Sequence, residues 1–207
     1  MNGITPSLVR EPWNKGKLVG QKRPLKQKDV WTIRAHLNLA DRCRDLAMFN
    51  LALDSKLRAC DLISLYVRDI AHGTEVLSRA TILQRKTQRA VVFEIMPATR
   101  RALGQWIADA NLLPTDHVFP GRRGPSTHLS TRQYARIVDD WCRQIGLDAT
   151  AYGTHSMRRT KVSMIYERTK NIRAVQLLLG HRKLENTVRY LGVELQDALA
   201  LSEETEI

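Results

Sequence analysis

The sequence predicts an α+β fold that is mostly helical, with one small antiparallel sheet near residues 67–96. The chain has 207 residues, of which 43% are hydrophobic, and this is enough for a single domain with its own core. Apolar residues recur every three or four positions through most of the chain, which is the helical period. Between residues 67 and 96 the pattern changes to β-branched and apolar runs, which are typical of strands.

A basic segment precedes the first predicted helix. Residues 1–28 contain seven Lys and Arg against Glu11 alone, and three prolines and three glycines interrupt any regular element. We therefore expect an extended, flexible arm. The helices that follow rest on apolar spacings such as Val30, Ile33 and Leu37. They are expected at Asp29–Leu39, Asp41–Leu53 and Ala59–Leu65.

The sheet is predicted from two runs that flank a polar stretch. Glu75–Leu83 and Arg89–Met96 are rich in β-branched and apolar residues, and residues 84–88 between them are polar. The two runs form a hairpin with Lys86 at its tip. Val67–Ile70 is expected to add a third strand.

The second half of the chain returns to helices. Pro97 is well placed to open a helix over Ala98–Ala110, because proline favours the first helical turn. Leu113–Ser130 contains three prolines and two glycines and is expected to be a loop. Further helices are expected at Thr131–Ile145, His155–Arg168, Ile172–Leu179, Thr187–Leu191 and Glu194–Leu201. The chain thus divides into an arm (1–28), a folded domain (29–202) and an acidic tail (203–207).

The charge of the chain indicates a polyanionic partner. There are 33 Lys and Arg against 21 Asp and Glu, which gives a formal net charge of +12. Besides the arm, residues 155–190 carry nine basic and two acidic side chains in a stretch that also holds many apolar residues, so this second cluster belongs to a folded surface. Two separate basic clusters favour a nucleic acid over an anionic membrane surface.

Cysteine usage and hydropathy indicate the cellular compartment in which the protein folds. The three cysteines form no C-x-x-C pair, which argues against a disulfide framework and a zinc site and favours a reducing compartment. The start of the chain has no apolar signal-peptide core, and no run of 18 apolar residues occurs. We expect a cytoplasmic protein that does not enter a membrane.

Several short patterns carry side chains suited to phosphate chemistry. His155 and Arg158 are three residues apart at a predicted helix start, so they share one face beside free backbone N–H groups. His181 follows an apolar run that ends in Gly180, and Tyr190 comes nine residues later. Each pattern alone also fits a surface pair or a packed core residue.

The order and spacing of the whole set distinguishes it from chance. An early arginine, a hairpin lysine, H-x-x-R, L-L-G-H and a tyrosine nine residues on resemble the tyrosine recombinase (phage integrase) family, including its short members such as fimbrial-type DNA invertases. The resemblance runs from about Lys28 to Ala200. The family's six catalytic positions correspond to Arg58, Lys86, His155, Arg158, His181 and Tyr190. Lys56 stands where the family usually has glycine, and Asp61 where glutamate is commoner.

The resemblance implies the catalytic fold of that family and a reaction that cleaves and rejoins DNA through a 3′-phosphotyrosine. Tyr190 would be the nucleophile, and Arg58 and Arg158 would bind the phosphate oxygens through bidentate guanidinium groups. Lys86 would protonate the 5′-oxygen leaving group, and His155 would accept or position the tyrosine proton. His181 would donate a hydrogen bond to a phosphate oxygen, and Asp61 would orient Arg58. No metal or other cofactor is implied.

Basic residues outside this set are expected to contact DNA. These are Arg159, Lys161, Arg182, Lys183, Arg122, Arg123, Lys15, Lys17, Lys22 and Arg23. Arg159 is included because it points roughly 100° around the helix from Arg158. Double-stranded DNA is the expected partner, bound by a homotetramer that assembles through Gly192–Leu201, with accessory DNA-bending proteins possible.

The resemblance leaves the biological outcome open. Integration, excision and inversion all use the same strand exchange, in a bacterial, phage or mobile-element setting associated with the nucleoid. A type IB-like topoisomerase would share the mechanism, and a DNA-binding regulator could keep the fold without the activity. The chain can be a single-domain enzyme or the catalytic part of a longer one, since most family members carry a further DNA-clamping domain upstream.

Overall fold

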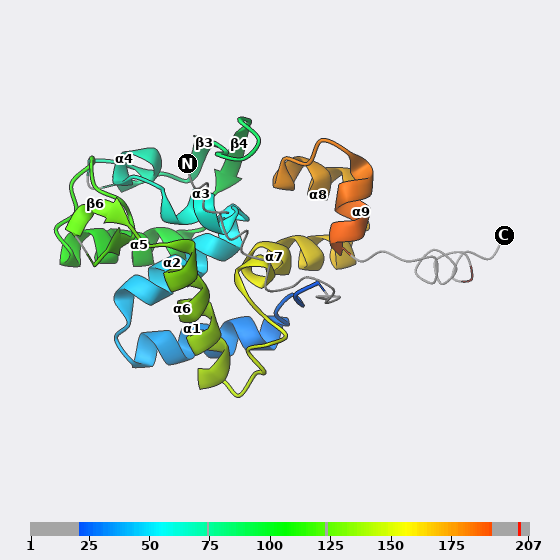
Figure 1. The fold of residues 1–207 in the computed structure, drawn as a ribbon, viewed down its shortest axis with the longest axis horizontal. Helices are drawn as coiled ribbons and strands as arrows, with labels where there is room; N and C mark the ends of the chain where they lie inside the picture. Colours follow the sequence, from blue (N-terminus) through cyan, green and yellow to red (C-terminus); the bar gives the residue numbers. More distant parts are fainter. Residues whose placement is uncertain (1–20, 74, 123, 192–202, 204–207) are drawn as a thin grey trace, which may run out of the picture.

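The computed structural model describes residues 21–73, 75–122, 124–191 and 203. Within these ranges the molecule is mostly helical with short antiparallel hairpins, which confirms the predicted α+β class. Figure 1 shows the first six helices and the hairpins packed together, with α8 and α9 set to one side of them beyond α7. The helix predicted at Glu194–Leu201 lies outside the described residues.

The helices of the first half surround α2. Helix α1 (Gln27–Leu39) buries Val30, Ile33 and Leu37, as their spacing predicts, and α2 (Cys43–Ser55) is buried on nearly all sides. Helix α2 ends at Lys56, whose φ of 55° is left-handed. Three further helices complete this part: α3 (Ala59–Ile63), α4 (Val67–Ile70) and α5 (Pro97–Asp109).

The predicted single sheet is three separate two-stranded sheets. The hairpin of β3 (Arg79–Leu83) and β4 (Ala90–Glu94) is as expected, with Ala80 opposite Phe93. Residues 71–72 (β1) instead pair with residues 75–76 (β2). The expected loop over 113–130 contains β5 (Pro120–Gly121) and β6 (Gly124–His128). The prolines and glycines of this segment predicted turns, so the extended backbone between them was not predicted.

The third predicted strand, Val67–Ile70, is wrong, because these residues form the helical turn α4. The β-branched side chains of Val67 and Ile70 favoured a strand. Asp69 overrides this preference, since its carboxylate accepts a hydrogen bond from the backbone N–H of Tyr66 at 2.8 Å. This closes a helical turn, and both apolar side chains become buried.

The remaining helices connect the main core to the outlying pair. Helix α6 (Thr131–Gln144) starts at Ser130 with a reciprocal cap from Gln133 and buries Trp141 in the main core. Helix α7 (Thr154–Thr169) packs against α2 on one side and against α8 (Ile172–Leu179) and α9 (Leu184–Leu191) on the other. Residue Met157 of α7 joins the main core, whereas Val162 belongs to a second, small cluster with Val175 and Leu179.

Residues 21–26 lie against the folded domain, although we expected them to belong to a flexible arm. The backbone N–H of Arg23 donates to the carbonyl of Ala151 at 3.0 Å, and that of Leu25 donates to the hydroxyl of Thr160 at 2.9 Å. Leu25 is buried. We call residues 21–25 the entry segment; the Leu25 side chain and these two hydrogen bonds are among the contacts that attach it to α7 and to the turn before it.

Candidate active site

Arg58 is held between helix α3 and the β3–β4 hairpin. It caps the start of α3, and its Nη1 donates to Oε1 of Gln84 at 2.6 Å. Asp61 is buried, with Oδ2 at 4.0 Å from Arg58 Nη1 and Oδ1 accepting the backbone N–H of Arg85 at 2.9 Å. Asp61 thus fixes the base of the hairpin beside Arg58, which is more than the orienting role expected of it.

His155 and Arg158 share the first turns of α7. Arg158 is buried, and its Nη2 donates to the carbonyl of Leu179 at the end of α8 at 2.9 Å. Its Nη1 is also buried and makes no hydrogen bond to a described residue. The Nη2 group of this guanidinium therefore makes a structural hydrogen bond, while the Nη1 group remains available to donate to an incoming oxygen.

His181 and Tyr190 lie at the two ends of the α8–α9 connection. Gly180 ends α8 with φ of 65°, and an added Cβ there would come within 2.9 Å of Val91, so only glycine suits this position. The Nδ1 atom of His181 lies 3.1 Å from the hydroxyl of buried Thr187. The His181 and Tyr190 rings meet edge to face at 5.4 Å.

The hydroxyl of Tyr190 is buried and makes no hydrogen bond to a described residue. Burial raises the pKa of Tyr190 to about 12, although the positive charges of Arg158, Arg159 and Arg58 oppose this shift. Arg158 is near enough to act on the hydroxyl, with its guanidinium 6.0 Å from the ring centroid, and among the cations it opposes the rise in the pKa of Tyr190 most. Tyr190 is therefore a protonated phenol at pH 7.

Both histidines are neutral in this surrounding. Burial and then the charges of Arg158 and Arg58 lower the pKa of His181 to about 4. His155 is exposed at the start of α7, and its pKa is lowered by partial desolvation and by the charges of Arg158, Arg159 and Arg58. A neutral imidazole can accept a proton, so His155 suits a general base.

A pocket of about 270 Å³ opens where the hairpin faces the α8–α9 connection. It is lined by Arg58, Thr87, Arg89, Gly180, His181, Arg182 and Asn186. Two of the predicted catalytic residues, Arg58 and His181, therefore face one cavity of strongly positive character. Arg89 was missed by sequence reasoning, which treated it as the first residue of a strand; its place directly after the polar stretch was the available signal.

Lys86 lies in the exposed turn of the hairpin and does not line this pocket. The turn position agrees with the prediction. The other four tyrosines have structural surroundings: Tyr66 stacks on His117, Tyr134 is fully buried, Tyr152 packs against the main core, and Tyr166 packs against the small cluster.

Two residues expected to contact DNA face inward. Arg159 is buried, with its Nη1 donating to the carbonyl of Lys22, and Lys161 forms ion pairs of 2.8 Å with Asp54 and Glu94. Sequence reasoning placed them outside because charged side chains usually seek water; here buried acids and a carbonyl replace the water. Arg182, Lys183, Arg122 and Arg23 are exposed, Lys22 is half-buried, and Lys15, Lys17 and Arg123 lie outside the described residues.

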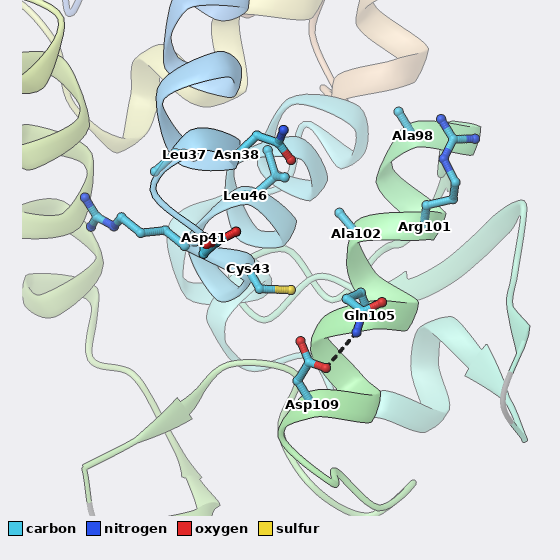
Figure 2. A pocket seen from close by; sticks show the side chains of 11 residues that line it. Leu37, Asn38, Asp41, Cys43, Leu46, Ala98, Arg101, Ala102, Gln105 and Asp109 are labelled. Carbon is cyan, nitrogen blue, oxygen red and sulfur yellow. Dashed lines mark hydrogen bonds between the residues drawn. The ribbon is translucent and has the colours of Figure 1, made fainter.

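A second pocket, of about 500 Å³, lies away from these residues. Figure 2 shows it between α1, α2 and α5, with Cys43 and Asp109 in its wall and none of the candidate catalytic residues. Within the described ranges, no three His, Cys, Asp or Glu side chains gather as metal ligands. Among the described helices, none is long and apolar enough to cross a membrane.

The described fold brings the Tyr190 ring beside the guanidinium groups of Arg158 and Arg159 and the ring of His181. The model of the phage integrase family matches residues 23–196, and the chain belongs to this family. The chain is 31% identical over 155 residues to tyrosine recombinase XerC of Actinobacillus pleuropneumoniae, covering 74% of this chain and 48% of that protein. It is 27% identical over 151 residues to the probable integrase/recombinase YoeC of Bacillus subtilis, covering 73% and 78%.

Solved structures show the same fold. The crystal structure of XerA recombinase matches with a TM-score of 0.71 at 17% identity, over 89% of this chain and 65% of that chain. The post-cleavage complex of XerH site-specific recombinase with its difH substrate matches with a TM-score of 0.70 at 16% identity, over 89% and 53%. The chain spans about half the length of the XerC relatives that it matches.

Proposed function

We propose that this domain performs site-specific DNA recombination, with Tyr190 forming a 3′-phosphotyrosine link to the cleaved strand. One observation carries the proposal: Arg58, Arg158, His181 and Tyr190 come from separate segments of the chain and converge beside one positively charged pocket. The names of the relatives, which are recombinases and integrases, support this function over DNA relaxation or mere binding.

Different residues assist the attack of the nucleophile and the departure of the leaving group. The Tyr190 oxygen attacks phosphorus and transfers its proton to His155, while the bond from phosphorus to the 5′-oxygen breaks. Lys86 supplies the proton that the departing 5′-oxygen needs, which requires the exposed hairpin tip to close over the bound strand. The phosphodiester energy stays in the tyrosine ester, so the reverse attack by a 5′-hydroxyl reseals the strand.

Charge stabilisation comes from the arginines. The non-bridging oxygens gain negative charge in the transition state, and Arg58 and the free Nη1 of Arg158 donate to them. The arginines lie close together and repel one another. An incoming phosphate offsets this repulsion, because it supplies a counter-ion to the pocket. Positive charge from guanidinium groups takes the place that a divalent metal would otherwise fill.

The wider assembly follows from the same proposal. DNA would lie across the exposed basic residues Arg182, Lys183, Arg122 and Arg23, with the arm adding phosphate contacts. Strand exchange joins two duplexes, each cut twice, so four copies act together, and Gly192–Leu201 would dock each copy on its neighbour.

The direct test is capture of the covalent adduct. Nicked suicide duplexes with a randomised recognition sequence trap the enzyme, because the short fragment after the nick diffuses away. Wild-type protein should form an adduct that survives denaturant, also in excess EDTA. Y190F should form none, whereas Y166F, the matched control from a structural position, should retain it. An adduct formed by Y190F would overturn the assignment of the nucleophile.

A further inference from the structure

Arg159 is a buried cation without an acidic partner. Only 7% of its surface is exposed, its Nε makes no hydrogen bond, and no described carboxylate forms an ion pair with it. Its one hydrogen bond, from Nη1 to the carbonyl of Lys22, is 2.9 Å long. Burying a charge without a counter-ion costs several kcal/mol, so this arrangement calls for an explanation.

The guanidinium of Arg159 lies over the aromatic ring of Tyr190. The central carbon of the Arg159 guanidinium lies 5.4 Å from the ring centroid, closer than that of Arg158 at 6.0 Å. A cation over an aromatic face is attracted by the ring, and the attraction grows when water is excluded. The attraction grows again when the phenol loses its proton, because a full negative charge then faces the arginine.

The other charged groups near Tyr190 have different tasks. Arg58, just before α3, lines the pocket where the phosphate would bind, and Arg158 on α7 keeps its Nη1 for a phosphate oxygen. His181 between α8 and α9 is neutral at pH 7. Once phosphate oxygens neutralise Arg58 and Arg158, Arg159 is the one of these three arginines that still acts on Tyr190 as a cation without an anion beside it.

Resting on the proposed function, we propose that Arg159 is a positioning residue for the nucleophile: it holds the Tyr190 ring and stabilises the phenolate that forms as the proton leaves. The entry segment completes this device. Its Lys22 carbonyl orients the Arg159 guanidinium, and its Gln21 Nε2 donates to the carbonyl of Arg189 in α9 at 2.8 Å. The nucleophile is thereby linked to the segment through which any upstream part of the protein would connect.

The test compares R159M and R159K with R168M, a matched control because Arg168 is an exposed arginine on the same helix. Adduct formation is measured in single turnovers at saturating DNA from pH 6 to pH 10, and DNA affinity is measured across salt concentrations. R159M should lower the rate at pH 7 by roughly 10- to 100-fold, because a desolvated cation–π contact contributes about 2 kcal/mol. The deficit should shrink as pH rises, since hydroxide then assists the ionisation that Arg159 no longer favours.

The control measurements separate the alternatives. R168M should match wild type, R159K should lose less than R159M because it keeps the charge, and DNA affinity should be unchanged in all three. A rate deficit that is equal at every pH, or a salt slope reduced by about one with a normal saturated rate, would make Arg159 a DNA contact and overturn the inference. If R159M does not fold, R159K decides by the same pH profile. Failure of wild-type protein to form any adduct would instead reject the proposed function.

Discussion

The two arginines and the tyrosine of the site belong to regions of very different construction. Arg58 is attached to the large core, where α2 lies buried among α1, α5 and α7. Tyr190 is on α9, which rests on a small cluster around Val162, Val175 and Leu179. The side that holds Arg58, the proposed phosphate-binding side, is therefore rigid, and the side that holds Tyr190, the proposed nucleophile side, can open at low cost. Local opening depends on the buried apolar surface that must be released.

A set of four charged side chains, two buried and two half-buried, strengthens the rigid side. Lys56 follows α2 with its Nζ 2.7 Å from Glu94 on β4, and Lys161 on α7 reaches both Glu94 and Asp54. Asp54 also accepts from the backbone N–H of Met96 and from the hydroxyl of Thr99. Four charged side chains thus tie α2, the hairpin and α7 together behind Arg58 and Arg158.

The largest expected effect comes from breaking this set. D54A leaves Glu94 as the one carboxylate of this set beside Lys56 and Lys161. It also leaves the Met96 N–H and the Thr99 hydroxyl without their acceptor. It should reduce the free energy of unfolding by about 3–5 kcal/mol. Urea unfolding measures this loss. D54N, which keeps the shape and one acceptor, should lose less. An unchanged urea midpoint in D54A would mean that the set does not hold the rigid side together.

Arg158 joins the two regions, because it lies on α7 and binds the carboxyl end of α8 through Leu179. R158A should slow adduct formation by about 10²–10³-fold, the usual cost of losing a transition-state donor. R158K should recover little, since a lysine offers no second edge for the phosphate. A single-turnover assay at saturating DNA checks both. Recovery to near wild type in R158K would show that charge alone suffices.

A substitution in the small cluster should destabilise α8 and α9 without unfolding the main core. L179A removes a fully buried side chain, which costs about 2–5 kcal/mol where the surroundings are tightly packed, and less where they relax. We expect hydrogen exchange to accelerate in α8 and α9 while the main core stays protected. The matched variant L37A, in the main core, should instead lower protection throughout. Uniform loss of protection in L179A would mean that the two regions unfold as one.

The sequence could predict the features that have local signals, but not those that depend on tertiary contacts. Helix α8 was predicted with its observed ends because both have local signals: the Asn171 side chain caps its start, and Gly180 ends it. The spacing of the family's motif also predicted that Tyr190 and Arg158 belong to one site, and the Arg158 guanidinium lies 6.0 Å from the Tyr190 ring centroid. Arg159 and Lys161 were assigned to DNA because their burial depends on partners distant in sequence, namely Lys22, Asp54 and Glu94. Tertiary contacts of this kind leave no local pattern.

The smallest expected effect is the pH dependence that His181 gives to α8 and α9. His181 has a pKa of about 4 in the folded protein, below the ordinary value of 6.5, because of its burial and the charges of Arg158 and Arg58. The unfolded state therefore takes up this proton first as pH falls, and stability from the neutral imidazole, complete above pH 6.5, is lost down to about pH 4. With partial exposure, we expect on the order of 1–2 kcal/mol, seen as faster hydrogen exchange in α8 and α9 at pH 5 than at pH 7 after correction for intrinsic rates. H181N should remove this dependence. Bound DNA should weaken it in the wild type, since a phosphate beside the arginines raises the pKa of His181 towards normal. Equal acid sensitivity in the main core and in α8–α9 would contradict a local origin.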